Sequence, residues 1–219
     1  QGDNVRVYTS DFRHIAKKKR TDKKENYIYI DSVKYSRNIS PQRLYSHHKT
    51  AKDLFQRLSG QEIDLLWVLV PPNSFVKEAA KYKIENRNTK LVFDIIDVWP
   101  ETMPLKKFKK FPFVESWRLL RDNWLNYADY VVTECDLFQK HLTENVNPER
   151  LKTIYLAREI KPYSSEPRLP EDKISLCYLG SINNIIDIPA IVKIIKEAEN
   201  YKPVTLHIIG DGESRCQLI

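Results

Sequence analysis

One ten-residue stretch, Val92 to Glu101, constrains the fold more than any other part of the chain. Its sequence, VFDIIDVWPE, is a run of apolar and β-branched residues that ends abruptly at Asp97 and Trp99. This pattern predicts a buried parallel strand that delivers a carboxylate and an aromatic ring to a loop at its carboxyl end. Ligands of open α/β sheets bind in the crevice outside such strand ends. We therefore interpret this loop as part of a site.

Two strand-like segments further along the chain also end in polar loops that contain glycine. The segment ISLCYLGS, residues 174–181, ends in Gly180 and Ser181, and TLHIIGDGE, residues 205–213, ends in the run from Gly210 to Glu213. Together with the first strand, they suggest two successive Rossmann-like units, each with a polar loop at its strand ends. This arrangement predicts a site shared between two domains.

Strand-like and helix-like segments alternate through the rest of the chain, which is typical of a doubly wound parallel sheet. The predicted fold class is therefore α/β. The strand at residues 64–70 is expected to be buried, and the basic run at residues 17–24 is expected to be a solvated loop. The other predicted strands cover residues 4–10, 26–33, 90–97, 130–134 and 151–156, and the predicted helices cover residues 41–58, 73–84, 113–127 and 187–200, with a short helix beginning at residue 136.

The same pattern predicts a domain organisation. Residues 1–157 form a first Rossmann-like domain, residues 158–172 form a linker rich in charge and proline, and residues 173–219 begin a second domain. The first strand follows Gln1-Gly2-Asp3 directly, a sequence that resembles a helix end entering a second strand. We therefore expect the first strand and helix of the first domain to be missing, and the chain to be a piece of a longer protein or a truncated product.

Composition limits the class of protein further. The formal net charge of +7 over 219 residues is compatible with an anionic substrate, a membrane surface or nucleic acid. The three cysteines are far apart and lack metal-ligand spacing, which is typical of reduced residues in a cytosolic protein. No stretch approaches the roughly 20 apolar residues that a membrane span needs, and the N-terminus lacks a secretory signal pattern.

These segments, taken in order, resemble the retaining, nucleotide-sugar-dependent glycosyltransferases of the GT-B fold, in the large family 4 group. The likeness is strongest to bacterial enzymes that build capsule, exopolysaccharide or O-antigen repeat units. The matching pieces are GDNVRVYTS, VFDIIDVWPE, NYADYVVTECDLFQKHL, LKTIYLA, ISLCYLGSI and TLHIIGDGES. The resemblance implies two Rossmann-like domains that face each other across a cleft. The first takes the acceptor, often a lipid-linked sugar, and the second holds most of the nucleotide-sugar donor.

The resemblance also implies roles for particular residues. Asp97 would act in catalysis, and Trp99 and Glu101 would line the cleft from the acceptor side. No metal or other cofactor is expected, because catalysis in such enzymes rests on positioning and on stabilising the departing diphosphate. The residues implied in donor binding are Gly180 and Ser181, near the diphosphate, and Gly210, Asp211, Gly212 and Glu213, near the nucleoside.

Three features depart from the family pattern. One is that residues 1–219 do not cover the glycine-rich first loop and the downstream acidic motif of the donor domain. Many relatives carry a histidine just before the aspartate, where this chain has Ile96. Many also carry an arginine and a lysine shortly after the first glycine of the donor domain, whereas residues 182–188 contain neither. The way in which this chain would hold the donor diphosphate is therefore open.

The segment LKKFKKF, just after the Trp99 loop, interleaves aromatic and basic residues. Such a segment can insert phenylalanines into the interface of an anionic membrane, with lysines at the headgroups; the alternative is a solvated basic loop. The membrane reading, together with the lipid-linked acceptor, predicts a cytoplasmic protein peripherally associated with the inner face of the plasma membrane. The residues expected to contact the membrane are Lys106, Lys107, Phe108, Lys109, Lys110 and Phe111.

Other interpretations stay open at this point. Asp97 can equally be a helix cap or loop anchor at a strand end, and Trp99 can be a packed core residue instead of a platform for a sugar ring. At the level of function, the alternatives are a nucleotide-sugar 2-epimerase of the same architecture and an inactive fragment that acts at most as an acceptor-binding domain. A nucleic-acid-binding module is disfavoured, because the basic residues are scattered and no recognition motif is present.

Overall fold

The fold is described from a computed structural model of the chain. It describes residues 3–103, 105, 111–142, 144–159, 170–182, 186–212 and 215–217. The chain divides into two compact units, residues 1–158 and residues 159–219.

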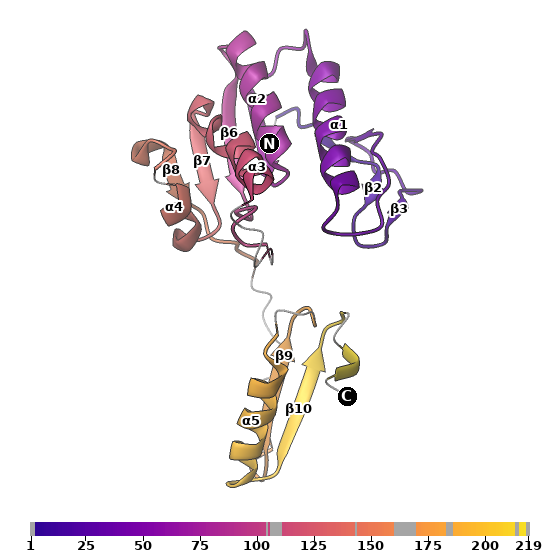
Figure 1. Ribbon diagram of the computed structural model, residues 1–219, viewed down its shortest axis with the longest axis vertical. Coiled ribbons are helices and arrows are strands. Elements are labelled where there is room, and N and C mark those ends of the chain that lie inside the picture. Colours follow the sequence, from indigo (N-terminus) through magenta and orange to yellow (C-terminus); the bar gives the residue numbers. More distant parts are fainter. Residues whose placement is uncertain are drawn as a thin grey trace. The chain divides into compact units, whose positions relative to one another are not determined.

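The first unit is built around a four-stranded parallel sheet in the order β5-β6-β7-β8 (Figure 1). Strands alternate with helices along most of this unit, as the sequence pattern predicts. The elements in chain order are β1 (Val7–Ser10), β2 (Phe12–Arg13), β3 (Lys18–Lys19), β4 (Tyr27–Ile30), α1 (Pro41–Leu58), β5 (Leu65–Val70), α2 (Asn73–Glu85), β6 (Lys90–Ile95), α3 (Pro112–Asp122), η2 (Leu125–Tyr127), β7 (Tyr130–Thr133), α4 (Asp136–Leu142), η3 (Pro148–Arg150) and β8 (Leu151–Thr153).

The second unit is a single βαβ arrangement, in which β9 (Ile174–Leu179) and β10 (Val204–Ile209) pair in parallel (Figure 1). Helix α5 (Ile188–Glu199) connects the two strands, and the side chain of Asp187 caps its first turn by accepting from Ala190 N–H at 3.0 Å. A short 3-10 turn, η4 (Arg215–Gln217), follows β10.

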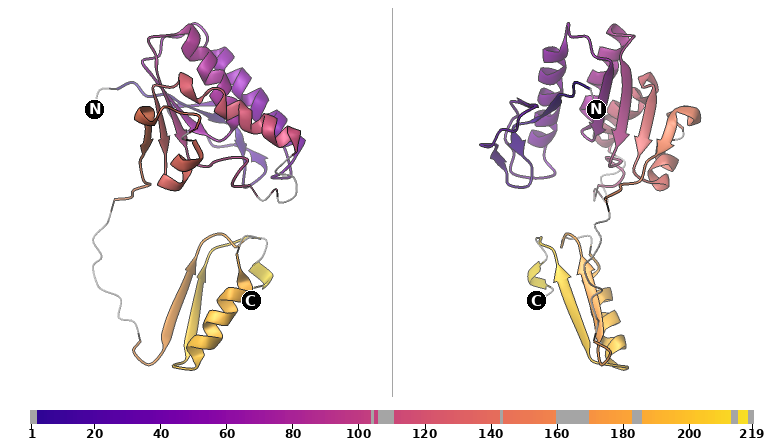
Figure 2. Two further views of the ribbon diagram at one scale, coloured as in Figure 1. Left: turned by 60° about the vertical axis from the view of Figure 1, so that its left-hand side comes forward. Right: turned by 180° about the vertical axis from the view of Figure 1, so that it is seen from behind.

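One face of the four-stranded sheet forms the core of the first unit. The parallel register aligns Val68, Phe93, Val131 and Leu151 across all four strands, and each of these side chains is buried. Helix α2 contacts β5 and β6 and packs between α1 and α3 (Figure 2). Alternation along each strand therefore sends one set of side chains into the layer of helices.

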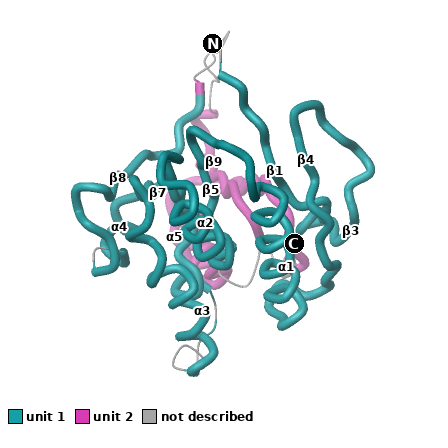
Figure 3. The backbone as a smooth tube through the Cα atoms, turned by 90° about the horizontal axis from the view of Figure 1, so that it is seen from above, with its two compact units in different colours: residues 1–158 teal, residues 159–219 magenta. Residues whose placement is uncertain are grey.

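The prediction that β5 is buried is wrong for half of its side chains. Leu65, Trp67 and Leu69 are about half exposed, with 54%, 49% and 56% of their surface accessible. The reason is topological: β5 is the edge strand of the four-stranded sheet, and β1 pairs with β4 in a separate two-stranded parallel sheet (Figure 3). Side chains of β5 that point away from α2 consequently lack a covering layer.

Helix α3 also differs from its prediction. It ends at Asp122, where the sequence pattern predicted a helix to residue 127. Trp124 donates its backbone N–H to Arg121 O at 3.0 Å, a 3-10 contact that tightens the last turn. The rings of Trp124 and Tyr127 then contact each other in a tilted arrangement, with centroids 5.6 Å apart and an interplanar angle of 32°.

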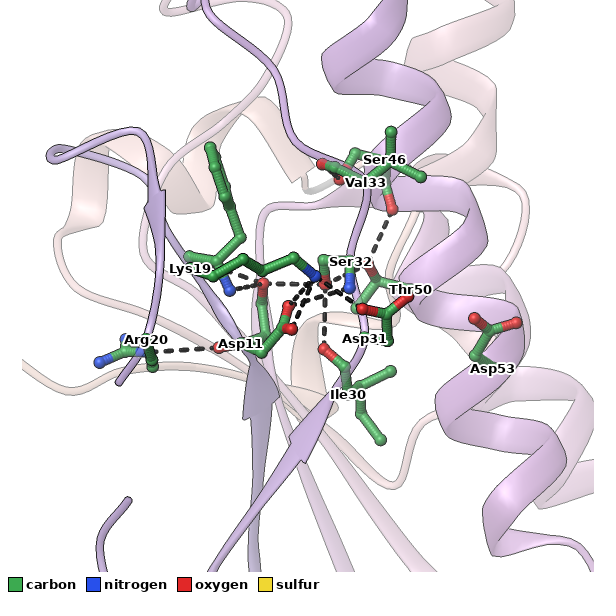
Figure 4. Close-up of polar contacts among 12 residues, drawn as sticks. Asp11, Lys19, Arg20, Ile30, Asp31, Ser32, Val33, Ser46, Thr50 and Asp53 are labelled. Carbon is green, nitrogen blue, oxygen red and sulfur yellow. Dashed lines mark hydrogen bonds and ion pairs between the residues drawn. The ribbon is translucent and has the colours of Figure 1, made fainter. Parts of the chain in front are cut away.

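Residue 18 and residues 21–24 of the basic run are exposed, as expected for a solvated loop, but Lys19 takes part in a polar network (Figure 4). Strands β2 and β3 pair as a short antiparallel hairpin, and Lys19 bridges Asp11 at 2.6 Å and Asp31 at 2.7 Å. Asp11 also accepts from Ser32 N–H at 2.9 Å, and the Ser32 hydroxyl lies 2.8 Å from that of Thr50 in α1. The network thus ties the hairpin to the carboxyl ends of β1 and β4 and to α1.

Lys19 bridges the carboxylates of Asp11 and Asp31, and these two residues are expected to differ in their contribution to stability. Asp11→Ala removes a shielded ion pair and the acceptor of a backbone N–H group, so the free energy of unfolding should fall by about 1–3 kcal/mol. Asp31, whose side chain is 82% exposed, is the matched control, and Asp31→Ala should have an effect close to zero. Urea denaturation of both variants tests this difference, and equal losses would contradict the role given to Asp11.

Candidate ligand-binding site

The buried face of α1 changes character halfway along the helix. Its first half carries polar side chains at helical spacing, and its second half carries Ala51, Leu54, Phe55 and Leu58, which join the core. Polar groups on a buried helix face are costly unless other groups satisfy them. The polar positions are Arg43, Ser46, His47 and Thr50.

Arg43 is the centre of this polar half, and only 9% of its surface is exposed. Its guanidinium donates to the Asn38 carbonyl at 2.6 Å and to His47 Nε2 at 3.4 Å. The group also lies over the Trp99 ring, 4.5 Å from its centroid, and 5.8 Å from that of Tyr35. In the described part of the chain, no carboxylate forms an ion pair with Arg43.

The hairpin adds further basic groups beside Arg43. His14 Nδ1 lies 2.8 Å from the Tyr35 hydroxyl, and Lys17 Nζ lies 3.4 Å from the same nitrogen. Lys17 also donates to the Asn38 side chain and lies 4.9 Å from the centroid of the Tyr35 ring. One cationic cluster, at the carboxyl ends of β1 and β4, therefore contains residues from the hairpin, from the connection before α1 and from α1 itself.

Both histidines of this cluster have pKa values below the ordinary value of 6.5. The pKa of His47 is lowered to about 3, first by burial and then by the charge of Arg43 and the neighbouring His14. Burial, Arg43 and Lys17 lower the pKa of His14 to about 4. Arg43 donates to His47 Nε2, which also fits the neutral form of this ring.

The loop after β6 connects to this cluster through Trp99. The Trp99 ring stacks on His47 with centroids 6.2 Å apart and an interplanar angle of 21°. Its indole N–H donates to Asp97 Oδ2 at 2.6 Å, and the Thr102 hydroxyl donates to Asp97 Oδ1 at 2.5 Å. Both oxygens of Asp97 are therefore engaged within the loop, which supports the interpretation of Asp97 as an anchor. Its catalytic role stays a prediction.

Arg121, in the last turn of α3, also holds this loop. Its guanidinium has no exposed surface and forms a two-pronged ion pair with Glu101, at 2.8 and 3.1 Å. It also donates to the Trp99 carbonyl at 2.8 Å and to Asp122 at 2.7 Å. Glu101 therefore orients the loop through a bidentate contact, the geometry that arginine and carboxylate favour.

The second unit brings most of its predicted site residues together. The loops after β9 and β10 are joined by hydrogen bonds from Gly180 N–H to the Ile209 carbonyl (3.0 Å) and from Ile182 N–H to the Asp211 carbonyl (2.9 Å). A Cβ atom on Gly210 would lie 1.9 Å from the Gly180 carbonyl oxygen, so this close approach requires glycine. Ser181, Asp211 and Gly212 lie in the same pair of loops.

Some predicted residues lie outside the described residues. Glu213 is one of them, and Lys106, Lys107, Phe108, Lys109 and Lys110 are the others. Phe111, directly before α3, is 53% exposed. No helix in the described ranges is both long and apolar enough to cross a membrane. Within the same ranges, no group of three His, Cys, Asp or Glu side chains is arranged to hold a metal ion.

Sequence reasoning located the Trp99 loop but missed the cationic cluster. The available signal was the spacing in α1, where Arg43, His47 and Thr50 fall on the face that later carries Leu54 and Leu58. A polar start to an otherwise apolar face marks a place where a helix covers a polar environment. The partners His14 and Lys17, by contrast, are brought in by the short hairpin, which has no strong pattern in the sequence.

Comparison with known proteins shows the fold alone. No protein-family model matches the chain, and neither does any curated protein. The chain is similar to a solved structure described as "Crystal Structure of TarM", with a TM-score of 0.51, 12% identity and coverage of 77% of this chain and 32% of that chain. A second structure, described as "Crystal Structure Analysis of the Glycotransferase of kitacinnamycin", aligns with a TM-score of 0.47, 10% identity and coverage of 83% and 52%.

The chain thus spans about a third of the first of these chains and about half of the second. The α/β class with Rossmann-like parallel strands, as in the GT-B fold, is confirmed.

Loss of Arg121 should destabilise the Trp99 loop strongly. Arg121→Ala leaves Glu101 and the buried Asp122 without this partner, and breaking a buried ion pair costs about 3–5 kcal/mol. Arg87→Ala, at an exposed position, is the control and should change the free energy of unfolding by less than about 0.5 kcal/mol. Urea denaturation measures both values. A loss below about 1 kcal/mol for Arg121→Ala would show that the loop does not depend on this residue.

His47 should make stability depend on pH. Its pKa in the folded chain, about 3, lies below the ordinary value of 6.5, so only the unfolded chain gains the proton between these values. The free energy of unfolding is therefore complete above pH 6.5 and falls as the pH drops toward 3, by roughly 1.4 kcal/mol per unit of pKa difference. Denaturation of His47→Gln and of the control His48→Gln, at an exposed neighbour, tests this. Only His47→Gln should flatten the pH profile, and an unchanged profile would contradict the assignment.

Proposed function

We propose that the chain is part of a glycosyltransferase that transfers a sugar from a nucleotide-sugar donor to a saccharide acceptor. The first unit takes the acceptor near the Trp99 loop, and the second unit contributes to donor binding through the loops after β9 and β10. The observation that carries this proposal is the glycine-lined pair of loops at the carboxyl ends of β9 and β10, in a chain with the GT-B fold.

The loop pair has the properties of a nucleotide-binding edge. A Cβ atom on Gly212 would lie 2.0 Å from the Ile182 carbonyl oxygen, so the backbones of the two loops approach closely only with glycine at this place. Asp211 and Arg215 form an exposed pair, with Arg215 Nη1 3.8 Å from Asp211 Oδ1. Arg215 thus supplies a cation after β10, whereas the sequence of residues 182–188 contains no basic residue, and a cation in this loop would stabilise a departing diphosphate.

The finer features of the proposal come from the sequence resemblance. The enzyme would belong to family 4, would retain the anomeric configuration without a metal and would act in capsule, exopolysaccharide or O-antigen synthesis. Its acceptor would be lipid-linked, and the basic segment that ends at Phe111 would contact an anionic membrane from the cytoplasmic side. Asp97 and Trp99 would face the acceptor, with the loop held by Arg121 and Glu101.

Nucleotide binding tests the donor side. Isothermal titration of the folded chain with UDP and with GDP should give saturable binding of at least one of them. Gly210→Ala forces a Cβ atom toward the Gly180 carbonyl and should weaken that binding by at least about tenfold. Asp211→Ala provides a milder second variant. Glu199→Ala is the control, because Glu199 is the exposed last residue of α5 and precedes the connection to the amino end of β10.

The outcomes separate the candidate functions. A folded chain that binds neither nucleotide, or binds them equally well after Gly210→Ala, would contradict the donor-side proposal and leave an acceptor-binding fragment at most. Release of a free, isomerised sugar nucleotide would instead identify a 2-epimerase. Binding to DNA or RNA that weakens steeply with salt would favour a nucleic-acid-binding module.

A further inference from the structure

The cations of the first unit differ in how their charge is balanced. Arg121 is paired with Glu101, Lys19 with Asp11, and Lys83 with Asp129 at 3.0 Å. Arg43 and Lys17 are different, because no carboxylate in the described ranges forms an ion pair with either of them. A buried charge without a counter-charge is unfavourable. Arg43, with only 9% of its surface exposed, carries such an unbalanced charge, and this exception therefore calls for a function.

The geometry of the cluster suits an anion. Arg43 approaches from the first turn of α1, and Lys17 and His14 approach from the hairpin. The first turn of α1 carries no acidic residue, so the amino end of this 18-residue helix adds to the positive potential instead of opposing it. Tyr35 and Trp99 lie beside the guanidinium and restrict its movement. The whole cluster lies at strand carboxyl ends, where α/β folds bind ligands.

We propose that Arg43, Lys17 and His14 form a binding site for a phosphoryl group. Two permanent cations match the charge of a phosphoryl group, about −1.5 to −2 at neutral pH, whereas a carboxylate would neutralise only one of them. A phosphoryl group also offers three oxygens to donors that come from different segments, and arginine suits this geometry particularly well.

The source of this phosphoryl group is the part of the inference that rests on the proposed function. In a glycosyltransferase whose first unit takes the acceptor, the group belongs to the diphosphate that links an acceptor sugar to its lipid. The same chemistry is present in the diphosphate of a nucleotide. A short-chain prenyl diphosphate and UDP represent the two sources, and inorganic pyrophosphate reports the site whatever its natural ligand is.

Calorimetric titration of the full chain with inorganic pyrophosphate tests the site. The chain should bind pyrophosphate, and Lys17→Gln and Arg43→Gln should each weaken binding by about tenfold, the effect of losing one charged hydrogen bond. Lys18→Gln is the matched control, one residue further along the same hairpin and exposed, and it should change the affinity by less than about twofold. If Arg43→Gln does not fold, the half-buried Lys17 still tests the site.

His14 provides an independent readout. Its neighbours in the cluster are Arg43 from α1, Lys17 from the hairpin and Tyr35 from the connection before α1. Burial, together with the charges of Arg43 and Lys17, lowers its pKa to about 4. A bound phosphoryl group neutralises these cations, so the pKa of His14 measured by NMR should rise when pyrophosphate is added. A surface lysine that merely attracts anions would not move it.

The results of these titrations either support or overturn the phosphoryl site. Absent pyrophosphate binding, or equal affinity in Lys17→Gln and Lys18→Gln, would overturn the phosphoryl site. Loss of prenyl diphosphate binding in Lys17→Gln, with UDP binding retained, would support the site and assign it to the acceptor. Loss of UDP binding alone would support the site and assign it to a nucleotide. A failure of the donor-side proposal is distinguishable from these outcomes, because the chain would then bind neither UDP nor GDP but would still bind pyrophosphate.

Discussion

The fully buried guanidinium of Arg121 is the interaction on which the candidate site of the first unit depends. It joins the end of α3 to the loop after β6, because it contacts Glu101, Asp122 and the Trp99 carbonyl at once. Each of its contacts is a charged or bidentate hydrogen bond, and such bonds fix geometry as well as adding free energy. The position of the Trp99 ring, and hence of the groups packed on it, follows from this anchor.

Two buried arginines of the same unit illustrate opposite ways of carrying a charge. Arg121 is neutralised by carboxylates of its own fold, so it serves the structure. Arg43 is surrounded by a carbonyl, neutral histidine and aromatic rings, which accept its hydrogen bonds but leave its charge in place. Burial lowers the pKa of both neighbouring histidines, and a charge retained in this way raises the local potential and lowers these pKa values further. The site is thus prepared for an anion before any ligand arrives.

The sequence predicted most elements because their hydrophobic period is local. Helix α1 was predicted at residues 41–58 and occurs there, since Ser40 and the proline after it mark its start. The exposure of Trp67 and the end of α3 at Asp122 were not predicted, because they depend on which layers cover a strand and on a last-turn contact. In the candidate site, Asp97, Trp99 and Glu101 were predicted from their place after a strand. The role proposed for Arg43 depends instead on residues that are distant in the sequence, such as Lys17 and Trp99.

Hydrogen–deuterium exchange with and without saturating UDP or GDP shows whether the loops at the strand ends of the second unit form a donor site. Nucleotide binding there should slow the exchange of the backbone N–H groups in the loops after β9 and β10, at residues 180–182 and 210–212, and leave the amino ends of both strands unchanged. Exchange that is unaffected by both nucleotides, or protection confined to other segments, would contradict it.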